Sequence, residues 1–213
     1  MQPRDEPAGS NRRDRAGPVA GVVLAAGLSS RMGKNKLLLE IGGTSVLRRA
    51  VLAAAAAGLD PIIVVLGHQR ELVQPSLAGI ACTPVVNEDY ASGIDTSLRA
   101  GFRALGDGVQ AAVAMLADMP FVTAEMLQAL VERWRRSEAP LAVSTYEGVL
   151  APPMLYGRQL FAELRELEGE GCGKRVVKRH RAEAIELAWP GVALADLDVP
   201  ADVERVRAVL NGR

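Results

Sequence analysis

The feature that most constrains the fold is an alternation that begins at Val19 and continues to the end of the chain. Short apolar runs rich in β-branched residues alternate with longer stretches of helical period. Strands are expected at 19–25, 62–66, 111–116, 141–145, 184–187 and 193–197. Helices are expected at 45–57, 95–105, 126–136 and 200–210. This alternation is typical of βαβ units, so it predicts an α/β fold built on a mostly parallel sheet.

Length and composition fit one folded unit that follows a polar segment. At 213 residues the chain is long enough for one sizeable core, and 49% hydrophobic and 23% charged residues are ordinary for a globular protein. Residues 1–18 are rich in charge and poor in apolar side chains, so they cannot bury enough surface to offset the entropy of ordering. We therefore expect a flexible tail over 1–18 and a single domain over 19–213.

The charge balance and the cysteines argue against several classes of protein. Basic and acidic residues number 25 each, so no global field attracts nucleic acid or an anionic membrane, and any phosphate binding must be local. Cys82 and Cys172 lie far apart without another Cys or His at a zinc-ligand spacing, which argues against a structural metal site or a disulfide framework. The longest apolar stretch, 51–57, is too short to span a bilayer. A cytoplasmic protein with free thiols is expected.

A glycine-rich segment directly follows the first expected strand. It combines a turn of small residues with two hydroxyls and three cations, at Gly27, Ser29, Ser30, Arg31, Gly33, Lys34 and Lys36. Glycine lets backbone N–H groups approach phosphate oxygens, arginine offers a planar fork and lysine a compact charge, so the segment suits a triphosphate. A Walker loop needs four residues between its glycines, whereas five separate Gly27 from Gly33, and the GxGxxG fingerprint is absent.

Three aspartates are candidate ligands of a metal ion. Asp118 follows the apolar run at 111–116, at the carboxyl end of an expected strand, where ligands of α/β sheets bind. Asp196 and Asp198 are two apart in an extended segment, so their side chains point to one face. Either could complete a magnesium site with Asp118. A second role is open for Asp198, which could cap a helix that begins near Pro200.

The segment 24–36, LAAGLSSRMGKNK, resembles the LAAGxSxRMGxxK signature of MobA-like nucleotidyltransferases, which include the molybdenum-cofactor cytidylyl- and guanylyltransferases. Further similarity follows in the family's order at 37–43, 87, 93–101, 117–122 and 196–202. The resemblance implies a Rossmann-like, mostly parallel sheet with helices on both faces, of the nucleotide-diphospho-sugar transferase or GT-A-like type. It implies that nucleotide is bound by Leu24, Ala25, Ala26, Gly27, Ser29, Ser30, Arg31, Gly33, Lys36, Asn87, Ser97 and Asp118.

The resemblance also implies a donor and a metal. The Ala-Ala-Gly form at 25–27 is similar to cytidylyl rather than guanylyl enzymes, which favours CTP over another NTP. Binding of Mg²⁺ (or Mn²⁺) is assigned by the family to Asp118 and to the aspartates of the later motif, Asp196 and Asp198. That later motif departs from the family pattern, because Val199 stands where the family usually has threonine.

A basic segment at 174–181 is the candidate binding site for the acceptor of the nucleotide. At helical spacing its cations would share a face that suits an anion such as a pterin phosphate, although a solvated basic helix gives the same pattern. The family's GDxGAR-like loop is matched by 170–175, which assigns acceptor binding to Lys174 and Arg175. The family's GHP-type loop is altered to Ala-Pro-Pro at 151–153, which leaves the acceptor open.

Together these residues predict a nucleotidyltransferase with Arg31, Lys36 and Asp118 as catalytic residues. The expected reaction transfers CMP from CTP to the phosphate of molybdopterin cofactor and releases pyrophosphate. That phosphate is already ionised near neutral pH, because its second pKa is about 6, so no general base is required. Two alternatives are transfer to a sugar or polyol phosphate, and a non-catalytic chaperone that delivers cofactor to a molybdenum hydroxylase. Asp95 favours the chaperone, since a carboxylate near the nucleotide could repel it.

Overall fold

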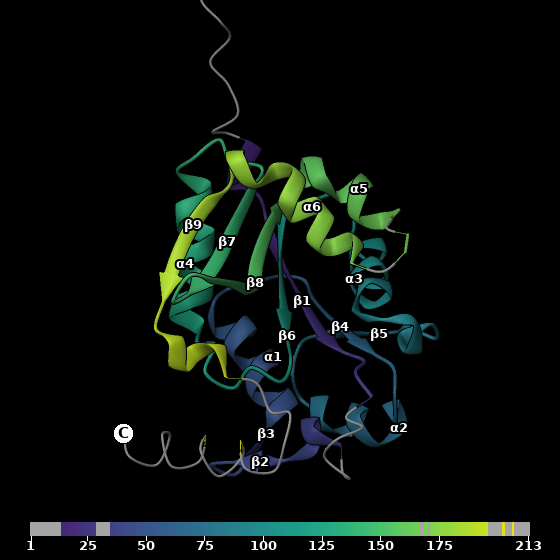
Figure 1. The fold of residues 1–213 in the computed structure, drawn as a ribbon. Helices are drawn as coiled ribbons and strands as arrows, with labels where there is room; N and C mark the ends of the chain where they lie inside the picture. The colour runs from purple at the N-terminus through teal and green to yellow at the C-terminus, as the bar shows by residue number, and fades with distance from the viewer. Residues whose placement is uncertain are drawn as a thin grey trace, which may run out of the picture.

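A mostly parallel sheet forms the centre of the molecule (Figure 1). The structure is a computed structural model, and it describes residues 14–28, 35–166, 168–169, 171–195, 202 and 206. The sheet has seven strands in the order β5-β4-β1-β6-β8-β7-β9. They are β1 (Val19–Ala25), β4 (Ile62–Leu66), β5 (Thr83–Val86), β6 (Ala111–Leu116), β7 (Leu141–Tyr146), β8 (Val149–Gly157) and β9 (Ile185–Trp189). Among the described strands of this sheet, β8 alone runs opposite to the rest, so the predicted mostly parallel sheet is confirmed.

Helices cover both faces of this sheet (Figure 1). One face carries α1 (Val46–Ala56) and α4 (Ala124–Arg135), and the other carries α3 (Ile94–Arg103), α5 (Phe161–Arg165) and α6 (Cys172–His180). Strand β1 contributes to both cores, because Val23 packs with α1 and α4 whereas Val22 packs with α3. Side chains alternate between the faces of a strand, so a strand buried on both faces must be apolar throughout. The predicted layers are thereby confirmed.

Local sequence determines where the main helices begin and end. The hydroxyl of Ser45 accepts the N–H of Arg48 at 3.3 Å before α1, and that of Thr123 accepts the N–H of Met126 at 3.4 Å before α4. Gly58 follows α1 with a φ of 75°, a conformation that favours glycine at helix ends. No helix in the described ranges is long and apolar enough to cross a membrane.

Smaller elements fall between β1 and β5 in the sequence, and they lie toward the carboxyl ends of the parallel strands (Figure 1). The hairpin of β2 (Glu40–Ile41) and β3 (Thr44–Ser45) precedes α1. The short helix α2 (Arg70–Val73) follows β4. Gly42 and Gly43 form the two-residue turn of the hairpin, both with positive φ, as a type I′ turn requires.

Strands β5 and β8 are absent from the sequence prediction. Proline lacks the N–H that a sheet requires, so Pro152 and Pro153 make 151–153 resemble a loop rather than a strand. The structure nevertheless pairs β8 with β7 through a two-residue turn at Glu147 and Gly148, both with positive φ. Such a turn joins antiparallel strands directly, so the Glu-Gly pair is the signal that could have indicated this hairpin.

The structure also corrects the two terminal regions. Residues 191–194 form a short 3₁₀ helix instead of the expected strand, and 196–197 lie outside the described residues. Of the expected helix at 200–210, Asp202 and Val206 are described and both are helical. At the other end, Arg15 is buried although it belongs to the expected flexible tail. Its guanidinium donates to the carbonyls of Trp134 and Ala139 and lies 4.3 Å from the centroid of the Trp134 ring.

Candidate nucleotide-binding site

A cavity of about 300 Å³ lies at the carboxyl ends of β1 and β6. The order in which strands are added to the sheet reverses at this point, since β4 and β5 extend it on one side of β1 and β6 lies on the other side. Such a reversal leaves a crevice beyond the strand ends, where ligands of open α/β sheets bind. The described lining consists of Leu24, Ala25, Ala26, Gly27, Leu28, Lys36, Leu37, Tyr90, Ala91, Gly93, Ile94, Ser97, Leu116 and Asp118.

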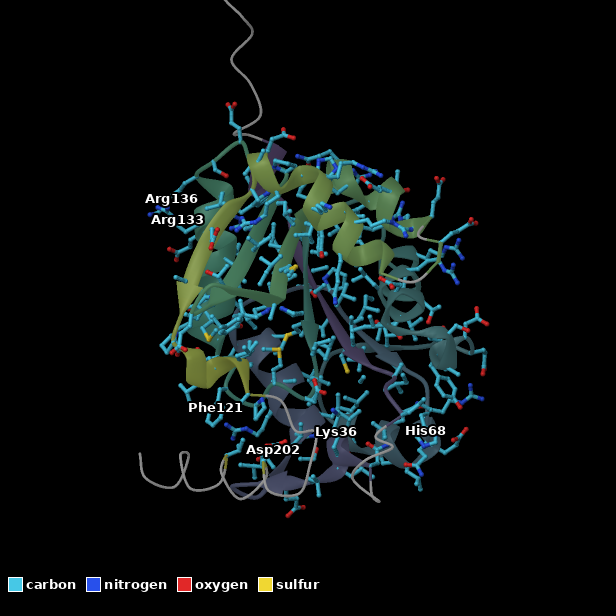
Figure 2. All side chains as sticks on the ribbon, viewed as in Figure 1. Lys36, His68, Phe121, Arg133, Arg136 and Asp202 are labelled. Atoms are coloured by element: carbon cyan, nitrogen blue, oxygen red, sulfur yellow. The ribbon has the colours of Figure 1, made fainter. Side chains whose placement is uncertain are left out.

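Lys36 and Asp118 form an ion pair in this cavity. The Nζ atom of Lys36 lies 2.6 Å from Oδ2 of Asp118, and the side chains are 13% and 17% exposed. Low exposure reduces screening by water, so these charges act strongly on whatever enters the cavity. Figure 2 shows Lys36 and His68 toward the same end of the molecule, the end at which β1 and β6 finish.

Asn35 positions Lys36, a role that the sequence analysis missed. Its Oδ1 accepts the N–H of Leu37 at 3.1 Å and caps the short 3₁₀ helix Lys36–Leu38. Its Nδ2 donates to Oε1 of Gln69 at 3.2 Å, which ties this helix to the segment after β4. Asparagine before a short helical turn is a capping signal, so the pattern was available in the sequence.

Gly67 and Tyr90 are further residues that the sequence analysis missed. Tyr90 lines the cavity, and Gly67 lies directly behind the cavity wall. A Cβ atom on Gly67 would lie 2.7 Å from Cβ of Tyr90 and 2.8 Å from Cβ of Ala26. Only glycine allows this close approach, and a glycine that directly follows a buried strand is the signal that could have indicated it.

Asn87 and Ser97, both expected to bind nucleotide, have different places in the structure. Ser97 is 4% exposed and lines the cavity, whereas Asn87 is not part of the described lining. The Nδ2 of Asn87 donates to the hydroxyls of Thr96 at 2.8 Å and Ser97 at 3.0 Å, and its Oδ1 accepts the N–H of Asp89 at 3.1 Å. Asn87 therefore shapes the segment that leads into α3.

Lys174 and Arg175 lie on α6, outside the described lining of the cavity. The segment is helical, although no helix was among those expected here, and both side chains are exposed while 176–177 are buried. At the other end of α6, Arg179 forms an ion pair with Glu163 of α5. The basic residues therefore form an exposed helix face that is partly neutralised by acidic neighbours.

Asp95 is engaged by the backbone of α6. Its carboxylate accepts the N–H groups of Gly171 and Gly173, each at 2.7 Å. Two charge-assisted hydrogen bonds at a helix N-terminus stabilise the negative charge where it stands. This arrangement removes the observation that favoured a non-catalytic chaperone, because the carboxylate is committed to α6.

Asp118 provides an oxygen ligand suitable for a divalent cation. Among the described residues, no group of three or more His, Cys, Asp and Glu could hold a metal ion. Magnesium is usually bound by one or two carboxylates together with substrate phosphates, so a single aspartate beside a cavity of about 300 Å³ fits that ion. Some predicted site residues lie outside the described ones, namely Ser29, Ser30, Arg31, Gly33, Asp196 and Asp198.

The fold and the position of the cavity define a class of α/β proteins that bind nucleotides at a switch point. Solved structures with the same fold include a nucleotidyl transferase from Methanothermobacter thermautotroptrophicus (Mth528). It is 24% identical, with a TM-score of 0.78, over 92% of this chain and 99% of that chain. The fold is therefore that of the nucleotide-diphospho-sugar transferases.

The model of the MobA-like NTP transferase domain matches residues 21–184, and the chain belongs to this family of nucleotidyltransferases. Purine catabolism protein PucB of Bacillus subtilis (strain 168) is 30% identical over 201 residues, which cover 90% of this chain and 97% of PucB. Rv0371c of Mycobacterium tuberculosis H37Rv is 30% identical, with a TM-score of 0.78, over 91% of this chain and 99% of that chain.

Two further comparisons concern a metal and the length of the relatives. A structure of Rv0371c in complex with manganese aligns at 29% identity, with a TM-score of 0.74, over 90% of this chain and 98% of that chain. The bifunctional protein GlmU of Desulfotalea psychrophila is 31% identical over 66% of this chain. This chain spans 41% of that GlmU, so it corresponds to only a part of such proteins.

Proposed function

We propose that the protein transfers CMP from CTP to the phosphate of molybdopterin cofactor, with Mg²⁺ or Mn²⁺ as cofactor and pyrophosphate as product. The observation that carries this proposal is the Lys36–Asp118 pair, 2.6 Å apart in a cavity at the switch point of the sheet. A metal-bound triphosphate needs a cation for its phosphates and a carboxylate for its metal ion, and this pair would supply both in one cavity. The product would serve a molybdenum hydroxylase.

The reaction requires neutralisation of charge more than proton transfer. The attacking phosphate is already ionised near neutral pH, so the site needs no general base. Negative charge develops on the transferring phosphoryl group and on departing pyrophosphate, and the ammonium of Lys36 would stabilise it in a weakly hydrated cavity. Arg31 would add a second cation to the same task. Asp118 would hold the divalent ion, which supplies electrostatic stabilisation of the phosphate oxygens.

The Lys36–Asp118 pair also gives a reason why the unliganded cavity is stable. A buried carboxylate without a partner is costly, and Lys36 compensates the charge of Asp118 at 2.6 Å. Entry of a metal-bound nucleotide would give each group a new partner, since the carboxylate would face the cation and the ammonium would face the phosphates. Each of the two charged groups would thus keep an oppositely charged partner when the cavity is occupied.

Relatives support the metal, and sequence features support the substrates. Rv0371c, at 29% identity in its complex, binds manganese, which supports use of a divalent ion. The Ala-Ala-Gly form at 25–27 supports CTP. The exposed basic face of α6 supports an anionic acceptor. The name of PucB associates a relative of nearly equal length with purine catabolism, and it identifies no acceptor.

The test is release of pyrophosphate from each NTP with magnesium and a panel of acceptors. We expect release with CTP and molybdopterin, and a loss of about 100-fold or more in Asp118→Asn because a charged group at the reacting centre is removed. Asp107→Asn is the matched control, since that side chain is 98% exposed in a loop. Turnover with a sugar or polyol phosphate, and none with molybdopterin, would show that the acceptor is of that alternative class. Tight cofactor binding without turnover, unaffected by Asp118→Asn, would support the chaperone.

A further inference from the structure

The first turn of α3 contacts two parts of the molecule. Ile94 and Ser97 line the nucleotide cavity, whereas the carboxylate of Asp95, which lies between them, binds the beginning of α6. Both of its oxygens are used, since Oδ2 accepts the N–H of Gly171 and Oδ1 accepts the N–H of Gly173, each at 2.7 Å. One helical turn therefore joins the cavity wall to the helix that carries Lys174 and Arg175.

The junction between α3 and α6 is tightly packed. A Cβ atom on Gly173 would lie 3.0 Å from Oδ1 of Asp95 and 3.1 Å from Cδ2 of Leu98. Gly171 has a φ of 70°, a conformation that side chains disfavour. The pKa of the buried Tyr156 phenol is raised, first by burial and second by the negative charge of Asp95. Asp95 is itself half-buried, so water competes less for its two hydrogen bonds than it would at an exposed site.

Helix α6 has such polar contacts at both of its ends. It has nine residues, and Val176 and Val177 are its described buried apolar side chains. At its C-terminal end, Nε2 of His180 lies 3.1 Å from Oε2 of Glu163. Figure 1 shows α6 beside α5 and α3, on the same face of the sheet. The two buried valines hold α6 on the sheet face, and the terminal contacts fix both of its ends.

We propose that Asp95 is a positioning residue that couples the nucleotide cavity to α6, so that a nucleotide in the cavity orders the helix face that receives an anionic acceptor. The acceptor role of that face rests on the proposed function, whereas the coupling requires only that a nucleotide occupies the cavity. Asparagine has the same shape but only one oxygen, and its amide N–H₂ would oppose the second backbone N–H. Asparagine can therefore keep one of the two hydrogen bonds, so it should retain only part of the coupling.

Hydrogen exchange of the purified full chain tests the coupling without any acceptor. Peptides from α3 and α6 are followed with and without CTP and magnesium, in wild type, Asp95→Ala, Asp95→Asn and the control Asp107→Asn. In wild type and control, we expect nucleotide to slow exchange in both helices. In Asp95→Ala, we expect α6 to exchange about tenfold faster and to stop responding to nucleotide, while α3 still responds. Asp95→Asn, which keeps the shape, should give a smaller change of the same kind.

Kinetics separate positioning from a merely structural role. The acceptor KM should rise in both Asp95 variants, while the nucleotide KM and kcat at saturating acceptor stay near wild type. The proposal is overturned if nucleotide slows exchange in α3 but not in α6 of wild type, if Asp95→Ala and Asp95→Asn leave the α6 response intact, or if α3 of the Asp95 variants also stops responding to nucleotide. Failure of wild type to modify any acceptor would instead overturn the proposed function, and the exchange comparison would still decide on the coupling.

Discussion

Replacement of Gly67 by alanine should narrow the nucleotide cavity from behind. A Cβ atom at this position would lie 2.7 Å from Cβ and 2.9 Å from Cγ of Tyr90, and 2.8 Å from Cβ of Ala26. Tyr90 and Ala26 both line the cavity. The new methyl group must therefore displace one or both of them toward the space that a nucleotide would occupy.

The magnitude follows from these distances. Carbon atoms pack favourably at about 3.5–4.0 Å, so the contacts must open by roughly 1 Å. Two of the three atoms are Cβ atoms, which no side-chain rotation can move, so the backbone must shift. Overpacking of this kind costs about 1–3 kcal/mol of unfolding free energy. A shift of roughly 1 Å in a binding wall should also weaken nucleotide binding by about 10- to 100-fold.

The comparison needs a glycine that tolerates a side chain. A Cβ atom on Gly106 would have no atom within 4 Å, and the φ of Gly106 lies outside the left-handed region, so Gly106→Ala is the matched control. Urea unfolding measures stability, and calorimetric titration with CTP and magnesium measures affinity. We expect the control to stay within about 0.5 kcal/mol of wild type. If Gly67→Ala matches the control in both measurements, the close approach has no consequence and the reasoning is refuted.

Three further predictions concern other residues. Gly27→Ala should leave the unfolding free energy unchanged, since nothing lies within 4 Å of the added Cβ. It should weaken nucleotide binding severalfold in calorimetry, because the methyl group covers the backbone that would face the phosphates, and unchanged affinity would contradict this. Arg15→Ala should lower the unfolding free energy by about 2–3 kcal/mol, because the side chain loses two charged hydrogen bonds and a ring contact. The control Arg133→Ala removes an exposed arginine and should leave the unfolding free energy unchanged, so equal melting curves of the two variants would count against the prediction. Burial raises the pKa of the Cys82 thiol, which lowers the fraction present as thiolate. Iodoacetamide at about pH 8 should therefore modify Cys82 more slowly in native protein than in urea, and equal rates by mass spectrometry would exclude that effect.

The sheet was largely predictable because its parallel strands are buried on both faces. Such strands must be continuous apolar runs, and the predicted ranges 19–25, 62–66 and 111–116 coincide with β1, β4 and β6. Strand β8 escaped prediction because it contains Pro152 and Pro153 and because its first half is more exposed than its second. Its pairing depends on the turn before it and on the neighbouring strands, which a single segment does not reveal.

In the candidate site, residue type was more predictable than role. Lys36 and Asp118 were predicted from separate motifs, and both line the same cavity. Asn87 was expected to bind nucleotide, yet its amide holds the hydroxyls of Thr96 and Ser97. The roles proposed for Arg31 and the other site residues outside the described ranges stay predictions.

The sequence by itself determined the buried parallel strands β1, β4 and β6, the helices α1, α3 and α4 that alternate with them, and the chemical groups that follow β1 and β6. These features depend on periodicity and on contacts between residues a few positions apart, which local sequence contains. Only the tertiary structure decided which distant partner each polar group would take. Asp95 binds the backbone of Gly171, 76 positions away, because packing of α3 and α6 on one face of the sheet brings them together. A carboxylate that could oppose a nucleotide thus became the cap of a helix.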